Sequence, residues 1–296
     1  MEQIGLLHDG QIYDLQTAEA LNIKGDIIKA DDSKESLEIL RHSCAHMMAQ
    51  AIKELYPEAK FFVGPVVKEG FYYDFKVESK ISDEDLPTIE KKMKEIADRK
   101  LPITRHETTK EEFYEKFKND ELKQAVLKNI KDETLTIYKQ GDFEDLCRGP
   151  HLPNTRMIRS FKLTRVAGAY LGGDEKNEMI TRIYGIAFFD KQALFDYTKM
   201  IEEAKKRDHR KLGTELELFT FNDDVGAGLP MWLPNGARLR SKLEHLLYKA
   251  HRVRGYEPVR GPEILKSEMW KISGHYANYK ENMYFTEIDE QEFAVK

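Results

Sequence analysis

Two pairs of helix-spaced side chains constrain this chain more than any other feature: His42 with His46, and Cys147 with His151. The members of each pair stand four residues apart, so one turn of helix, or a tight turn, points both side chains the same way. Three imidazoles and one thiol brought together can hold a zinc ion, or can act as acid, base and orienting groups around a small pocket. Each pair alone is a weak signal, and the surrounding sequence decides its meaning.

Length and composition describe a well-charged globular protein of 296 residues, 41% hydrophobic and 33% charged. This length suits two domains of about 100–200 residues each. No apolar run approaches the roughly 18 residues of a membrane span, and the N-terminus MEQIGLLHDGQIYDL lacks the basic start and apolar core of a signal peptide. The two cysteines stand at unrelated positions, which indicates reduced thiols rather than a disulfide framework. We therefore expect a cytoplasmic protein with no membrane partner.

The net charge of −5 argues mildly against a dedicated nucleic-acid coat protein, although two local basic regions remain. One spans residues 205–211. The other consists of Arg238, Arg240, Lys242, Lys249, Arg252, Arg254 and Arg260. Each is either a solvated helix face or a contact surface for RNA.

Helical periodicity is clearest directly around the first pair. A helix is predicted to open near Ser33 or Ser36 and to end at Pro57. Its apolar stripe consists of Leu37, Leu40, Cys44, Met47, Ala51 and Leu55. His42 and His46 fall roughly opposite that stripe, so we expect them to face water or a cleft. Before this helix, residues 1–32 are predicted as two short strands with a turn at residues 8–10.

The remaining elements alternate between short strands and helices. Two strands are predicted within residues 60–76, and a second helix is capped at Ser82, with Leu86, Ile89, Met93 and Ile96 on its buried face. A short strand at 101–105 precedes a third helix that opens with the capping box Thr109–Glu112. Further strands are predicted around 134–138, 156–166 and 179–188. The order indicates an α+β domain that ends near Asp190.

After Asp190 the pattern changes to longer helices. A helix from Lys191 to about Lys211 is predicted to connect two domains, and a glycine-rich loop follows at 225–230. A long helix is predicted from Asn235 to about Arg254, and a strand over residues 255–262.

Several stretches resemble, in the same order, the editing domain of bacterial threonyl-tRNA synthetases: RHSCAHMMAQAIKELYP, GPVVKEGFYYDF, DLCRGPH, KLTRVAGAYLGGD and RIYG. The segment KRDHRKLG resembles the connector into the catalytic domain of that family. Residues 228–264 are similar to motif 1 of class II aminoacyl-tRNA synthetases, and WKISGHYANYKENMYF is typical of the threonine enzyme.

The resemblance implies four regions. They are a reduced N-terminal extension (1–35), a seryl-tRNA-deacylating editing domain (36–190), a connector helix (191–212), and a truncated class II catalytic domain with motif 1 and the start of its antiparallel sheet (213–296). It also implies that a cysteine ligand of the catalytic zinc, and motifs 2 and 3, which hold ATP, would come after residue 296. We therefore expect the N-terminal portion of a threonine–tRNA ligase, which by itself forms no threonyl-adenylate.

The resemblance also implies the site residues. The catalytic group comprises His42, His46, Lys123, Asp145, Cys147 and His151, and Tyr73 contacts the substrate. We expect His42 to lie near the ribose and the attacking water, and Lys123 to position or polarise that water. Asp145 would hold the seryl ammonium, while Cys147 and His151 would set the width of the pocket.

Zinc is the competing interpretation of His42, His46, Cys147 and His151, because the related editing domain of alanyl-tRNA synthetase uses the same spacings to hold zinc. In the threonyl family this site works without metal, and we expect editing to require no cofactor. For the complete enzyme the resemblance implies ATP, Mg and Zn as cofactors, tRNA(Thr), threonine and serine as further partners, and a homodimer formed through motif 1.

Two other classes of function stay open. One is a stand-alone trans-editing hydrolase, which the motif 1 segment argues against, because such a protein needs no aminoacylation domain. The other is a non-catalytic tRNA-binding or dimerisation module, which only the basic helices support.

Overall fold

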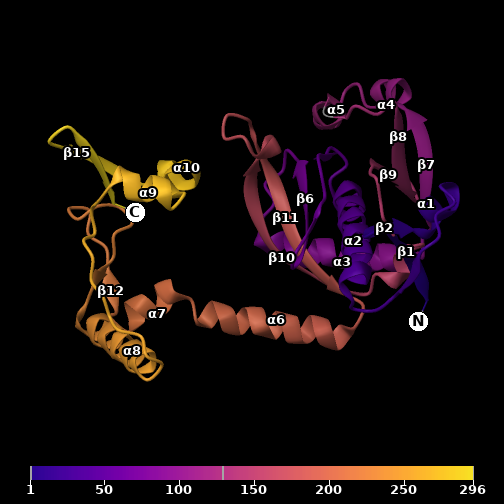
Figure 1. The fold of residues 1–296 in the computed structure, drawn as a ribbon. Helices are drawn as coiled ribbons and strands as arrows, with labels where there is room; N and C mark the ends of the chain where they lie inside the picture. The colour runs from indigo at the N-terminus through magenta and orange to yellow at the C-terminus, as the bar shows by residue number, and fades with distance from the viewer. Residues whose placement is uncertain (1, 129, 296) are drawn as a thin grey trace. The chain divides into compact units, whose positions relative to one another are not determined.

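The computed structural model describes residues 2–128 and 130–295. The chain divides into two compact units, an N-terminal unit (residues 1–204) and a C-terminal unit (residues 205–296), whose elements Figure 1 labels. Each unit is described by itself. Within the described ranges, no helix combines the length and the apolar character needed to cross a bilayer.

The centre of the N-terminal unit is an antiparallel sheet with the order β10-β11-β6-β4, in which β5 also pairs with β6. Its strands are β4 (Lys60–Phe61), β5 (Val66–Val67), β6 (Gly70–Lys76), β10 (Ser160–Tyr170) and β11 (Met179–Phe188). Two helices, α2 (Lys34–Leu55) and α3 (Leu86–Asp98), pack together against this sheet (Figure 1). The main hydrophobic core lies between the helices and the sheet.

Local sequence signals explain where these two helices begin. Ser33 is the N-cap residue of α2, as predicted. The capping box of Ser82 with Asp85 opens a short 3₁₀ turn (Asp83–Asp85) that leads directly into α3. The predicted face of α3 is buried, since Leu86, Ile89, Met93 and Ile96 all belong to the core. In α2, every residue from Ser43 to Ile52 is buried, so this helix is enclosed on all sides.

A second antiparallel sheet, of order β7-β8-β9, consists of β7 (Ile103–Thr109), β8 (Thr134–Gln140) and β9 (Phe143–Leu146). Two short helices accompany it, α4 (Lys110–Lys116) and α5 (Glu121–Lys128), and α4 opens with the predicted capping box of Thr109 with Glu112. The pairing of β8 with β9 sets Tyr138 opposite Asp145, and Cys147 follows β9 directly. Strand β9 and helix α5 were not predicted from the sequence.

The first thirty residues form a third sheet, of order β2-β1-β3, with strands β1 (Gln3–His8), β2 (Gln11–Asp14) and β3 (Asp26–Lys29). Helix α1 (Leu15–Ala20) lies between β2 and β3 in the chain. The prediction of two strands therefore missed β3 and α1. Ile4 and Ile28 are buried in the main core. This segment therefore packs its apolar side chains into the core of the N-terminal unit and does not form a core of its own.

The connector is two helices rather than one. Helix α6 (Lys191–Lys206) stops before Asp208, whose side chain accepts a hydrogen bond from the backbone N–H of Arg210 and caps a new helix, α7 (His209–Glu215). This cap, within the basic run, was not predicted from the sequence.

The C-terminal unit contains α7, the predicted long helix α8 (Pro234–Arg252), and two short helices, α9 (Ser267–Ile272) and α10 (His275–Tyr279). Its short strands are β12 (Phe219–Thr220), β13 (Met231–Trp232), β14 (Leu265–Lys266), β15 (Tyr284–Ile288) and β16 (Gln291–Val295). The strand predicted over residues 255–262 is absent from the structure of that segment. No neighbouring strand pairs with it, and Val259 is 93% exposed. The two units together mix helices with antiparallel strands, which confirms the α+β class.

Candidate functional site

Helix α2 supplies the first pair of side chains. His42 and His46 lie one turn apart on it, with ring centroids separated by 5.2 Å in an edge-to-face arrangement. His46 is buried and His42 is half-buried. The expectation that they face water or a cleft holds only for His42, because other parts of the N-terminal unit also cover the helix on the histidine side.

The second pair lies in a loop, not in a helix. Cys147 follows β9, and its backbone N–H donates to the carbonyl of Thr136 in β8. Gly149 then turns the chain with a φ of +75°, a conformation that glycine adopts without a steric penalty. This tight turn returns His151 to the neighbourhood of Cys147.

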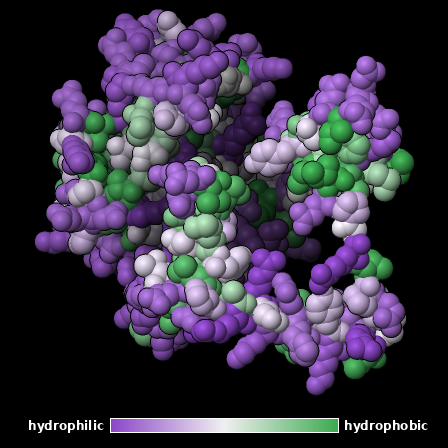
Figure 2. All heavy atoms as spheres, turned by 90° about the vertical axis from the view of Figure 1, so that its left-hand side faces the viewer, coloured by the Kyte–Doolittle hydropathy of each residue, from purple (hydrophilic) through white to green (hydrophobic). Residues whose placement is uncertain are grey.

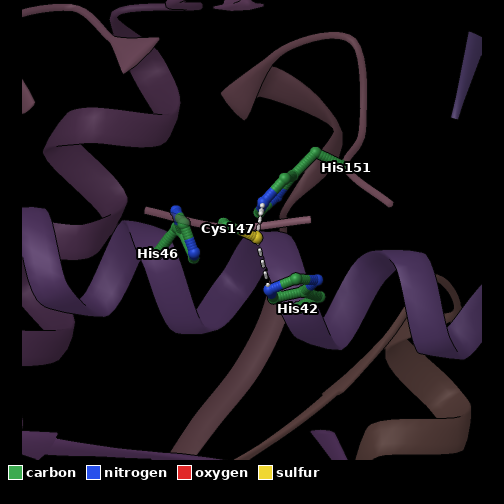
Figure 3. A group of neighbouring side chains, drawn as sticks. All are labelled: His42, His46, Cys147 and His151. Atoms are coloured by element: carbon green, nitrogen blue, oxygen red, sulfur yellow. Dashed lines mark hydrogen bonds between the residues drawn. The ribbon is translucent and has the colours of Figure 1, made fainter. Parts of the chain in front are cut away.

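The two pairs meet, as the family resemblance implied (Figure 3). The Cys147 Sγ lies 3.1 Å from Nε2 of His42 and 3.2 Å from Nε2 of His151. The His151 ring lies 4.3 Å, centroid to centroid, from the rings of both His42 and His46. The four groups can present ligand atoms that all lie within 4.8 Å of one another. We call these four residues the His/Cys cluster.

Ser43 orients one ring of the cluster. Its hydroxyl donates to the carbonyl of Ile39 and accepts from the backbone N–H of Leu152, while Nδ1 of His151 lies 3.2 Å away. Because the hydroxyl proton is committed to Ile39, His151 is the donor in the third contact. Its Nε2 therefore carries a lone pair directed at the Cys147 thiol. Ser43 was not predicted as a site residue, although it stands inside the HxxxH motif.

Burial keeps the cluster uncharged near neutral pH. Desolvation lowers the pKa of His42 to about 4 and the pKa values of His46 and His151 well below the ordinary histidine value. The same effect raises the pKa of the Cys147 thiol far above its usual range. The cluster thus offers neutral imidazoles that can accept protons, and a protonated thiol that is a poor nucleophile.

A buried ion pair forms the second part of the site. The ammonium of Lys123, from α5, contacts one carboxylate oxygen of Asp145, and the hydroxyl of Tyr73 donates to the other. All three side chains are at most 4% exposed. Burial opposes both charges of the pair, raising the pKa of Asp145 and lowering that of Lys123 to about 8. Lys123 is therefore poised to exchange a proton near neutral pH.

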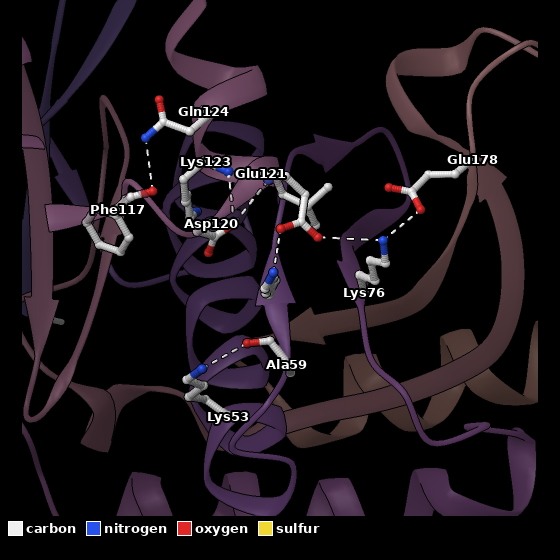
Figure 4. Close-up of polar contacts among 11 residues, drawn as sticks. Lys53, Ala59, Lys76, Phe117, Asp120, Glu121, Lys123, Gln124 and Glu178 are labelled. Carbon is white, nitrogen blue, oxygen red and sulfur yellow. Dashed lines mark hydrogen bonds and ion pairs between the residues drawn. The ribbon is translucent and has the colours of Figure 1, made fainter. Parts of the chain in front are cut away.

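Helix α5 holds Lys123 at this position. Its first turn is capped by Asp120, whose carboxylate accepts from the backbone N–H groups of Leu122 and Lys123 at 3.1 Å (Figure 4). Glu121 joins the helix to the central sheet through ion pairs with Lys60 and Lys76. These contacts explain how a lysine on a short surface helix reaches a buried carboxylate.

The two parts of the site adjoin each other. Asp145 precedes Cys147 by two residues, and the rings of His46 and Tyr73 lie 6.3 Å apart. Lys123 and Asp145 also line a cavity of about 490 Å³, together with the apolar rings of Phe61 and Phe143. Its volume lies within the range of small-molecule sites, about 300–1,000 Å³. Cys147 borders a second cavity of about 360 Å³. The structure thus brings together all seven side chains that the resemblance implied.

The donor set of the cluster is also one that Zn²⁺ takes, three imidazoles and a thiol. The separations of 3.1–3.2 Å between sulfur and nitrogen are shorter than the roughly 3.5 Å that tetrahedral zinc ligands require, so the side chains would have to move slightly apart to hold the ion. Chemically, the residues present could hold zinc if the thiol lost its proton.

Comparison with known proteins relates the chain to one enzyme family. Residues 135–184, which include Asp145, Cys147 and His151, match the family model described as the threonyl and alanyl tRNA synthetase second additional domain. The threonine–tRNA ligase of Campylobacter jejuni (serotype O:2) is 69% identical over 295 residues, which cover 100% of this chain and 49% of that protein. That of Campylobacter lari is 74% identical over 266 residues, 90% of this chain and 44% of that protein.

A solved structure, the RNA binding domain of threonyl-tRNA synthetase from Cryptosporidium parvum Iowa II, is 44% identical, with a TM-score of 0.29 and coverage of 30% of this chain and 22% of that one. The chain spans about half the length of the curated relatives it matches. The resemblance read from the motifs is confirmed: along its whole length this chain is similar to threonine–tRNA ligases, and its residues 135–184 match the second additional domain of the threonyl and alanyl enzymes.

Proposed function

We propose that the N-terminal unit is the editing site of a threonine–tRNA ligase and hydrolyses the ester of seryl-tRNA(Thr). The main support is the convergence of the His/Cys cluster with the pair formed by Lys123 and Asp145; of these residues, Asp145, Cys147 and His151 lie in the segment that matches the synthetase domain. Such a pocket would discriminate between serine and threonine. Serine lacks one methyl group of threonine, and one methyl is worth only about 1–3 kcal/mol in a binding site. A second pocket that excludes the larger amino acid is therefore needed.

The proposed reaction needs an attacking water, a base and donors for the developing negative charge. His42, which is neutral near pH 7, accepts a proton from the water as its oxygen attacks the ester carbonyl carbon. The bond to the ribose oxygen then breaks, and that oxygen takes up the proton that His42 accepted from the water. Lys123 positions the water or polarises the carbonyl, and Asp145 binds the ammonium of the seryl group in place of, or beside, Lys123.

The roles of the remaining residues follow from what they touch. Tyr73, held by Asp145, forms part of the wall that meets the substrate. Cys147, His151 and His46 fill the space beside His42 and restrict the width of the pocket. We propose that editing uses no metal; a cluster that instead holds Zn²⁺ would lose activity to a strong chelator and would contain about one zinc per chain.

For the longer protein we propose the activity for which the relatives are named, ATP-dependent charging of tRNA(Thr) with threonine in the cytoplasm. Mg and Zn would be its further cofactors, and motif 1 in the C-terminal unit would form a homodimer. Trans-editing as a separate protein, and non-catalytic tRNA binding, are less well supported. The chain matches ligases along its whole length, and its site carries chemistry that a binding module does not need.

The decisive experiment compares seryl-tRNA(Thr) with threonyl-tRNA(Thr) as substrates of the purified 296-residue chain. We expect release of serine and very slow release of threonine, with or without a strong chelator. Equal rates with both substrates would contradict the proposed pocket. No hydrolysis of either would favour the binding module.

A further inference from the structure

Asp14 is a buried carboxylate that the reaction described above does not use. It stands at the end of β2 and at the N-cap of α1, in the segment that precedes the editing domain, and its exposure is only 2%. A buried carboxylate is costly unless its oxygens receive hydrogen bonds, so its partners reveal what it holds in place.

The two oxygens of Asp14 have different partners. Oδ1 accepts from the backbone N–H of Thr17 at 2.7 Å, which is an ordinary local helix cap. Oδ2 accepts from the hydroxyl of Tyr138 at 2.6 Å and from the backbone N–H of His151 at 3.1 Å. Both partners of Oδ2 are more than 120 residues away in sequence. A helix cap alone would not require them.

These partners adjoin the His/Cys cluster directly. The ring of Tyr138 lies 4.5 Å, centroid to centroid, from the ring of His151. The chain between Cys147 and His151 belongs to no helix or strand, so contacts from other segments must define its path. At Gly149 the packing is so close that an added Cβ would lie 2.6 Å from the Tyr138 hydroxyl and 2.7 Å from Oδ2 of Asp14.

We propose that Asp14 is a positioning residue of the editing site: its Oδ2 fixes the loop that carries Cys147 and His151, so the N-terminal segment takes part in building the pocket. This inference rests on the proposed function. It gives residues 1–30 a role, since the sheet β2-β1-β3 delivers Asp14 to the loop. It also explains why the hydroxyl of Tyr138 lies within reach of both Asp14 and Thr17.

The first test is kinetic and uses the 296-residue chain with seryl-tRNA(Thr). Asp14→Ala should lower kcat by about 10–100-fold with little change in KM, because a shift of about 1 Å in a catalytic geometry can cost this much. It should also reduce the preference for seryl over threonyl ester. Tyr138→Phe, which keeps the ring, should have a smaller effect in the same direction. Asp26→Ala, an exposed acid at the start of β3 in the same sheet, is the matched control and should leave kcat unchanged.

Thermal unfolding of each variant, measured in parallel, gives the folded fraction at the assay temperature. The inference is overturned if Asp14→Ala keeps the wild-type kcat, or if its loss of activity only follows the loss of folded protein.

The second test does not depend on activity and so separates this inference from the proposed function. Amide hydrogen exchange of His151, read by NMR, should be slow in the wild-type chain because its N–H is bonded to Asp14. Asp14→Ala should accelerate it at least about tenfold, and Asp26→Ala should not. Unchanged exchange in Asp14→Ala would overturn the inference even if the wild-type chain proved inactive on seryl-tRNA.

Discussion

The two units of this chain differ sharply in how they bury apolar side chains. The N-terminal unit contains a continuous core, formed by α2, α3 and the central sheet with contributions from the first thirty residues. Among the described residues of the C-terminal unit, only Met283 and Ala294 are buried apolar side chains. Helix α8 buries nothing but Gly236. Figure 2 shows apolar residues, in green, at the surface of the molecule.

Several large apolar side chains are exposed within residues 228–264, the segment that resembles motif 1. Trp232, Leu239, Leu243, Leu246 and Leu247 are 47–63% exposed. The difference between the two units shows what apolar residues at helical spacing can predict. They identify a helix face suited to packing, but not whether the same chain buries that face.

The largest expected effect is on chemistry and is confined to the N-terminal unit. His42→Ala or Lys123→Met should each lower the rate of seryl-tRNA hydrolysis by about 10²–10⁴-fold, the usual span for groups that move or position a proton. Cys147→Ala should cost less, because a protonated thiol only shapes the pocket. Single-turnover deacylation measures all three. Wild-type rates in all three variants would remove the catalytic assignment.

The next largest expected effect is on stability and compares a buried leucine of α2 with an exposed leucine of α8. Leu40→Ala in α2, where the side chain is fully buried, should lower the free energy of unfolding by about 2–5 kcal/mol. Leu243→Ala in α8, where the side chain is 54% exposed, should change it by less than about 0.5 kcal/mol.

The tryptophans allow the two units to be followed separately. Both of them, Trp232 and Trp270, lie in the C-terminal unit. Leu40→Ala should therefore shift the circular dichroism transition while leaving the fluorescence transition in place. If both probes shift together, the units unfold as one and the comparison fails.

The smallest effect concerns pH. Folding lowers the pKa of His42 to about 4, and those of His46 and His151 fall as well. Between pH 6.5 and 4 the unfolded chain therefore binds more protons than the folded chain, so the free energy of unfolding falls as the pH falls. Thermal unfolding followed by circular dichroism should show this between pH 7 and 5, and less of it in His42→Gln. A free energy of unfolding that stays constant between pH 7 and 5 would contradict the burial of the His/Cys cluster.

Local signals predicted much of this structure because their physics is local. The capping boxes of Ser82 with Asp85 and of Thr109 with Glu112 mark helix starts through hydrogen bonds within a few residues, and Ser33 stands at the N-cap of α2 without a side-chain capping bond. The face of α3 also follows from its own periodicity. The spacing of the His and Cys pairs predicted a shared direction within each pair, and the family resemblance predicted that the pairs meet.

What escaped prediction depends on contacts distant in sequence. The four residues of β9 have no pattern of their own and are a strand because β8 lies beside them. The segment 255–262, in contrast, has strand-like residues but no neighbour to pair with. One oxygen of Asp14 serves as a local helix cap, but no local feature indicates that the other oxygen holds a loop about 137 residues away.

The enclosure of α2 has a consequence for how this protein can change over time. Helix α2 carries two of the three histidines of the site and the largest share of the buried core, so a substitution along it can impair the chemistry, the folding, or both. A change at Gln50 that widens the cavity beside Lys123 would also disturb side chains packed on the opposite face. Mutational tolerance should therefore be lowest along this helix, and selectivity for the amino acid should be easier to alter from α5 or the loop after β9.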